Sequence, residues 1–156
     1  MKRMTLALMI VLVLLCSCAP VPADEPRALF LSYRDVELMV GMAADEVIAQ
    51  LGDDYTMTEA ESCAGQGMDR MDTYPSVRLY VFAPVEGVAV ISSVSYIDDG
   101  VTTDGLRIGS AAEDVVAAMG EPDEQNEARL VYRSEAAVLT FGLRDGIVVS
   151  VVLAGE

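Results

Sequence analysis

Three cysteines, Cys16, Cys18 and Cys63, are the reactive side chains that first attract attention in this sequence of 156 residues, which contains no histidine. A catalytic cysteine needs a base or a cationic neighbour to form a thiolate, and a cysteine–histidine pair is excluded here. Arg70 lies near Cys63 in sequence and favours a thiolate, whereas the carboxylates of the same segment oppose it. We therefore expect Cys63 to be a buried, inert thiol, with an intermolecular disulfide as a minor alternative.

The N-terminus has the layout of an export signal. Lys2 and Arg3 are followed by an unbroken apolar run from Leu6 to Leu15 and by the small residue Ser17 before Cys18. The run is shorter than the ~20 apolar residues that a membrane-spanning helix needs.

The segment Leu15-Cys16-Ser17-Cys18 resembles the bacterial lipobox, in which a peptidase cuts before a cysteine that carries a diacylglyceryl group. A cut before Cys16 would leave bulky Leu15 where the peptidase needs a small residue, whereas Ser17 meets that need for Cys18. We expect residues 1–17 to be a lipoprotein signal peptide and Cys18 to be acylated, with an ordinary secretory signal as the alternative. Two or three acyl chains would anchor the protein stably outside the cytoplasm.

The charge balance limits the partners of this chain. Lys and Arg number 10 and Asp and Glu 25, for a net charge of −15, which makes nucleic acid an unfavourable ligand. Removing residues 1–17 takes away two cations and changes the net charge to −17. Anionic headgroups repel such a domain, so the lipid must hold it, and residues 18–27 are expected to be the acylated cysteine and a stiff, proline-rich spacer.

An internal match is the main signal in the remaining sequence. Leu38–Gly52 aligns without a gap on Leu106–Gly120, at an offset of 68 residues and with seven of fifteen positions identical. Each copy predicts a short strand, a glycine turn and a helix of about nine residues that ends at glycine. Ser110 and Glu113 predict a capping box at the start of the second helix.

Strand-forming runs follow each predicted helix. Ile91–Tyr96 matches Val148–Leu153 at an offset of 57, and Asp145-Gly146 predicts a hairpin turn. The expected fold class is α+β, with two tandem repeats of a short helix packed on an antiparallel β-sheet, over residues 28–100 and 101–156.

The two offsets differ by 11 residues, so the first copy contains an insertion, which we place within Thr56–Tyr74. An extra loop on one of two similar units is where an asymmetric function would lie, although a longer packing loop is an equal alternative. The candidate binding residues of this loop are Cys63, Gly65, Gly67, Asp69 and Arg70.

This arrangement of glycine turn, short helix and antiparallel strands resembles the tandem repeat of the β-lactamase inhibitor protein and the outer-membrane assembly lipoproteins of SmpA/OmlA type. Four segments are more closely similar to an uncharacterised lipoprotein family of Gram-positive gut bacteria: Ser62–Asp69, Ile91–Asp99, Thr103–Ser110 and Val149–Val151. The resemblance covers essentially the whole mature domain and implies a fold and a location, but no known activity. Inhibition of β-lactamase is an analogy of fold alone.

No motif for metal, cofactor or catalysis is present. The acidic clusters do not match the calcium-loop template, and we interpret them as solvated loops. We therefore expect a non-catalytic, lipid-anchored module that binds an envelope or secreted protein through a sheet face or the candidate loop. The alternatives are a carboxylate-dependent envelope hydrolase and a structural component of an envelope assembly complex.

Overall fold

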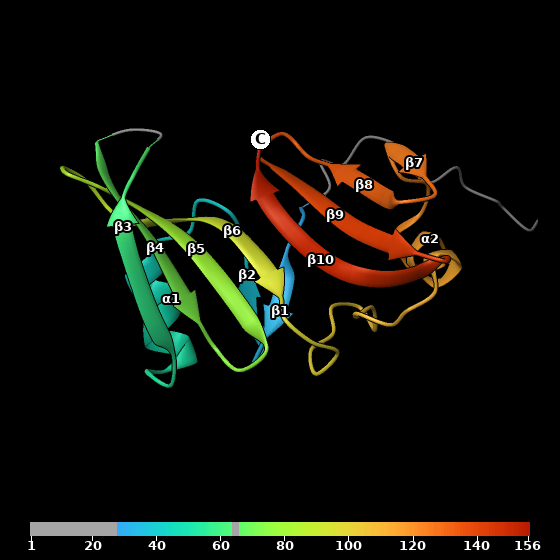
Figure 1. Cartoon of the computed structure of the whole chain (residues 1–156), viewed down its shortest axis with the longest axis horizontal. Helices are drawn as coiled ribbons and strands as arrows, with labels where there is room; N and C mark the ends of the chain where they lie inside the picture. The colour runs from blue at the N-terminus through green and yellow to red at the C-terminus, as the bar shows by residue number, and fades with distance from the viewer. Residues whose placement is uncertain (1–27, 64–65) are drawn as a thin grey trace, which may run out of the picture.

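The computed structural model describes residues 28–63 and 66–156 (Figure 1). The predicted signal peptide, Cys18, the spacer and Gly65 lie outside the described residues. Within the described ranges there are two helices, α1 (Ala44–Leu51) and α2 (Ala112–Met119), and the rest of the regular structure is antiparallel β. The fold is therefore α+β in the coarse sense, but mainly β. Neither helix is long and apolar enough to cross a membrane.

The strands form a small ribbon and one large sheet. The ribbon pairs β1 (Leu31–Tyr33) with β2 (Val36–Leu38). The large sheet is antiparallel throughout and has the order β3-β4-β5-β6-β10-β9-β8-β7. Its strands are β3 (Thr56–Glu61), β4 (Gly67–Thr73), β5 (Val77–Pro84), β6 (Val90–Tyr96), β7 (Glu124–Asn126), β8 (Arg129–Arg133), β9 (Ala137–Arg144) and β10 (Ile147–Gly155).

We call α1 with β3–β6 the first half of the molecule, and α2 with β7–β10 the second half. The halves meet where β6 pairs with β10 (Figure 1). In that pairing Ser95 lies opposite Val152, and these two residues are 57 apart in sequence. The β5–β6 and β9–β10 pairings each contain a register shift. These shifts leave Ser92 of β6 and Val149 of β10 without an opposite residue, and these two residues are also 57 apart. The central strands of the two halves therefore correspond at the offset seen in the sequence.

Each helix begins with a backbone bond to the residue just before a strand, Ala89 before β6 and Gly146 before β10, rather than with a side-chain cap. The N–H of Ala44 donates to the carbonyl of Ala89, and the N–H of Ala112 donates to that of Gly146, each at 2.9 Å. The predicted capping box is wrong, because α2 has Ala111 as its N-cap with no side-chain bond. The Ser110 hydroxyl instead accepts the N–H of Arg107. Backbone acceptors from the sheet satisfy the free N–H groups that a cap would otherwise serve.

The helix ends agree with the prediction. Gly52 and Gly120 close the helices with φ of 90° and 80°, and their N–H groups donate to Ile48 and Val116 at 2.9 and 2.8 Å. Glycine adopts this backbone without the steric cost of a Cβ.

The strand predictions hold for the central strands and fail at two details. Asp145-Gly146 forms the predicted turn between β9 and β10, with φ of 54° and 74°. The short strand expected before Gly109 is absent, since Leu106 only bridges Thr103. The insertion is also not confined to Thr56–Tyr74, because residues 85–89 connect β5 to β6 where two residues connect β9 to β10.

The hydrophobic core lies on one face of the sheet, beneath the helices and the ribbon. Val77, Leu79 and Val81 alternate inward from β5, and Val47 of α1 and Val115 of α2 are fully buried against the same core. α1 buries Ala44, Val47 and Leu51, whereas α2 buries only Val115. Neither of the two described helices lies on the opposite face of the sheet, which we call the open face.

Candidate functional site

The candidate binding loop is a hairpin made by β3 and β4. Cys63 is exposed near its turn, so the expectation of a buried thiol is wrong. Gly67 begins β4 with φ of 147°, and a Cβ there would lie 2.3 Å from the Ala83 carbonyl oxygen. Gly67 therefore permits the close approach of β4 to β5 and is a structural glycine.

Asp69 and Arg70 of the candidate loop face opposite sides of the sheet. Asp69 pairs with Phe82 and is exposed on the open face. Arg70 pairs with Val81, whose side chain is buried in the core. Successive residues of a strand point to opposite faces, so these two residues do not form one site with Cys63.

Arg70 instead forms an ion pair with Asp72, a residue that the sequence analysis did not select. Arg70 Nε and Nη2 lie 3.1 and 2.9 Å from Asp72 Oδ2. Asp72 is fully buried, and its Oδ1 has no hydrogen-bond partner among the described residues. Burial raises the pKa of Asp72 above its ordinary value, and the charge of Arg70 opposes that rise. Residues two apart on a strand share a face, so an arginine and an aspartate at this spacing could have predicted the ion pair if a strand had been predicted here.

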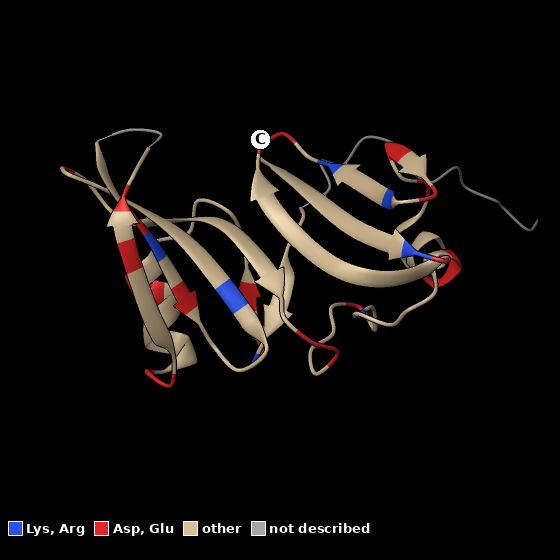
Figure 2. Ribbon diagram, viewed as in Figure 1, with Lys and Arg blue, Asp and Glu red and all other residues tan. Residues whose placement is uncertain are grey.

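The open face is poor in carboxylates. The central strands β5, β6, β9 and β10 contain no Asp or Glu, and Figure 2 shows the acidic residues at the helix starts, the loops and the outer strands. An open depression of about 610 Å³ lies across β4, β5, β6 and β10. Asp69, Tyr80, Ser92, Ser93, Ser95 and Val152 contribute to its lining. Tyr80 is 37% exposed, which is high for a central strand.

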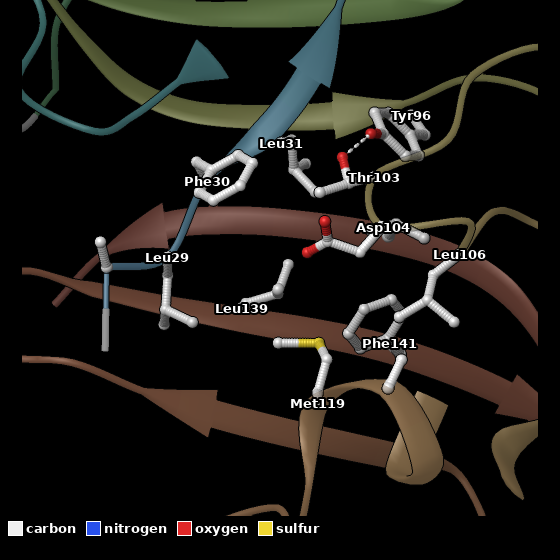
Figure 3. Close-up of a pocket in the computed structure, with 13 residues that line it drawn as sticks. Leu29, Phe30, Leu31, Tyr96, Thr103, Asp104, Leu106, Met119, Leu139 and Phe141 are labelled. Carbon is white, nitrogen blue, oxygen red and sulfur yellow. Dashed lines mark hydrogen bonds between the residues drawn. The ribbon is translucent and has the colours of Figure 1, made fainter. Parts of the chain in front are cut away.

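A smaller cavity of about 190 Å³ lies on the core side of β9 and β10 (Figure 3). Its walls are mainly apolar, and among the described residues that line it Asp104 alone is charged. The hydroxyl of Tyr96 bonds to Thr103 and to the carbonyl of Ser32, which ties the turn at Asp104 to β1. Burial raises the pKa of Tyr96. The volume is near that of a cavity that accepts benzene, ~150 Å³, so it suits a small apolar molecule only.

The acidic segment after α1 has a structural role. Asp54 accepts two hydrogen bonds of 2.6 Å from Arg34, which also donates to the carbonyl of Leu51 at 2.8 Å. Arg34 lowers the pKa of Asp54 and places a cation at the C-terminal end of α1, where the helix dipole favours it. In residues 28–63 and 66–156, no three His, Cys, Asp or Glu side chains gather as a metal site.

Comparison of the chain with protein-family models, curated proteins and solved structures found no match. Its function has to be inferred from its own surfaces.

Proposed function

We propose that the protein is a lipid-anchored, extracytoplasmic binding module that presents the open face to another envelope or secreted protein. In this proposal residues 28–100 and 101–156 are tandem repeats, joined through β6 and β10. The repeated helix-to-strand bonds and the 57-residue correspondence across the sheet support that division. Cys18 carries the lipid and the spacer holds the domain away from the bilayer.

The single observation that carries the binding role is the composition of the open face. A chain with 25 carboxylates keeps them out of its four central strands and places an exposed tyrosine and several serines there. Tyrosine contributes large contact area at low entropic cost. Depletion of Asp and Glu, with an arginine such as Arg78 of β5 retained, is typical of protein interfaces.

The hydrolase alternative is less favoured. Among the described carboxylates, Asp72 has the pKa that burial raises most clearly, and a raised pKa is what a general acid needs. Its side chain has no exposed surface, however, and it accepts a hydrogen bond from Arg70. A general acid must reach its substrate, so Asp72 is better explained as part of a structural ion pair.

Site-directed crosslinking tests the proposal. A photoreactive residue at Tyr80 of the mature domain carrying Cys18→Ser should crosslink a protein from an envelope extract, and excess unlabelled domain should compete. The same residue at exposed Ala49 of α1 is the control and should give no such product. Equal crosslinking from both positions, or none from Tyr80, would overturn the proposal. The anchor is tested separately: the unaltered chain should incorporate labelled palmitate, and the Cys18→Ser variant should not.

A further inference from the structure

The two edges of the large sheet are unequal. β7 has only three residues, and Glu124 in it is held by Arg129 and Arg133 at 3.0 and 2.6 Å. β3 has six residues, all of them exposed, and its pairing with β4 is continuous, without a bulge. Natural proteins protect sheet edges by shortening, bulges, proline or charge, and β3 uses only the last of these.

The alternation of hydrogen bonds between β3 and β4 shows which backbone groups of β3 do not bond to β4. Ser62 N–H donates to the Gly67 carbonyl at 3.0 Å, which makes Ser62 and Gly67 a hydrogen-bonded pair. Such pairs alternate along an antiparallel ladder, so Thr56, Thr58 and Ala60 face β4. The backbone N–H and C=O groups of the remaining residues therefore point away from the sheet: Met57, Glu59 and Glu61.

We propose that β3 accepts an extended, lysine- or arginine-bearing segment of another protein, which pairs with it as an added strand. The outward groups of Met57, Glu59 and Glu61 supply the main-chain bonds of such an addition. This edge is a different surface from the open face, so the inference goes beyond the proposed function.

The local charge selects a cationic partner. Glu59 lies directly across from Arg70, and Glu61 lies across from Met68. Both glutamate side chains are on the face of the sheet that carries Arg70 and Asp72. Asp45 and Glu59 act electrostatically on Asp72, and Arg70, the nearby cation, is already bound to it. An added strand with lysine or arginine at every second position places a cation beside each glutamate.

A second copy of this chain is a poorer occupant. Antiparallel pairing of two β3 strands brings four glutamates together, in two molecules that each carry a net charge of −15. Like charges close together across strands are destabilising. Met57, which is 53% exposed, lies on the same face as the two glutamates, where the aliphatic stem of a lysine on the added strand can cover it.

The test uses the mature chain with Cys18→Ser and a capped peptide of roughly ten residues that alternates lysine and valine. Binding should slow amide hydrogen exchange at Met57, Glu59 and Glu61, whose N–H groups have no hydrogen-bond partner among residues 28–63 and 66–156. Exchange at Thr58 and Ala60 should change less. Protection that appears only on β7 or on the open face would overturn the proposal.

Glu59→Pro is the decisive variant. It removes one outward N–H and leaves the bonds to β4 intact, so the free energy of unfolding should change little. Peptide affinity should fall roughly tenfold, from the lost bond and the blocked approach. If Glu59→Pro unfolds the domain, Glu59→Gln with Glu61→Gln replaces it. That pair should weaken lysine-peptide binding but not the binding of a neutral threonine–valine peptide.

Three further outcomes distinguish the alternatives. Unchanged lysine-peptide affinity in both variants would refute the edge site. Self-association that Glu59→Pro abolishes, without peptide binding, would assign the edge to a second copy and refute the cationic partner. Crosslinking from Tyr80 should persist in Glu59→Pro, which keeps failure of this inference separate from failure of the proposed function.

Discussion

The two halves of the molecule share their centre and differ at their periphery. In both halves the glycine before the helix donates its N–H to the last strand, from Gly41 to Ile91 and from Gly109 to Val148, each at 2.8 Å. The outer arms differ, since β3 and β4 have six and seven residues where β7 and β8 have three and five. The shared part builds the core, and the asymmetric part creates a free edge.

The two halves also differ in the residues that their outer strands bury. Val94 and Val151 correspond at the offset of 57, and their partners on the next strand are Leu79 and Phe141. One strand further out, Leu79 pairs with Asp72, whereas Phe141 pairs with Leu130. Asp72 and Leu130 are both fully buried, so the first half places a carboxylate where the second places a leucine.

The largest effect should come from breaking the ion pair that distinguishes the halves. Arg70→Met leaves Asp72 buried and unpaired, and should lower the free energy of unfolding by about 3–5 kcal/mol. Asp72→Leu should cost less, because the Arg70 side chain is 13% exposed and can reach water. The double variant should recover most of the loss, since apolar side chains replace buried ion pairs well. Urea denaturation of all four proteins measures this cycle, and additive losses would contradict it.

The pH dependence of the same variant gives an independent check. Because burial raises the pKa of Asp72, the folded state binds its proton more tightly than the unfolded state does. This contribution to stability is fully present below the ordinary carboxyl pKa and is lost as the pH rises through the raised pKa. Removal of Arg70 should raise the pKa further. The destabilisation caused by Arg70→Met should therefore shrink between about pH 7 and about pH 4.

The next effect concerns how deeply the helices are buried. Leu51 ends α1 and is 3% exposed, whereas Met119 ends α2 at the corresponding position and is only partly buried. Leu51→Ala should cost about 2–5 kcal/mol, and Met119→Ala about 1–2 kcal/mol. Val47→Ala and Val115→Ala are the matched control and should cost similar amounts, because both valines are fully buried. Equal losses at Leu51 and Met119 in thermal or urea unfolding would remove this difference between the halves.

The smallest effect tests a contact that both halves share. The hydroxyls of Tyr74 and Tyr132 donate to the carbonyls of Gly52 and Gly120, each at 3.0 Å. Tyr74→Phe and Tyr132→Phe should each lower the free energy of unfolding by about 0.5–1.5 kcal/mol, the usual net value of one hydrogen bond. Burial raises the pKa of Tyr74 to about 12, so a spectroscopic titration reports whether its environment survives in Tyr132→Phe. A loss confined to one variant would show that the two contacts are not equivalent.

The sequence predicted those elements whose conformation depends on a few adjacent residues. The glycines after the helices, the turn at Asp145-Gly146 and the apolar runs of the central strands each depend on a few adjacent residues. The β3–β4 arm escaped prediction as strands because Thr56–Glu61 is solvated on both faces and shows no apolar alternation. The capping box failed because a distant carbonyl, that of Gly146, satisfies Ala112. Cys63 was misplaced because burial is decided by neighbours that lie far away in sequence.

The sequence by itself determined the chemical limits and the local conformations: a strongly acidic chain without histidine, two short helices closed by glycine, and strand-forming runs. Only the tertiary structure decided the strand order, the pairing of β6 with β10, the faces on which Asp69 and Arg70 lie, and which edge stays free. The physical reason is that pairing between distant strands depends on which faces the helices cover and on register, and a shift of one residue reverses every side chain.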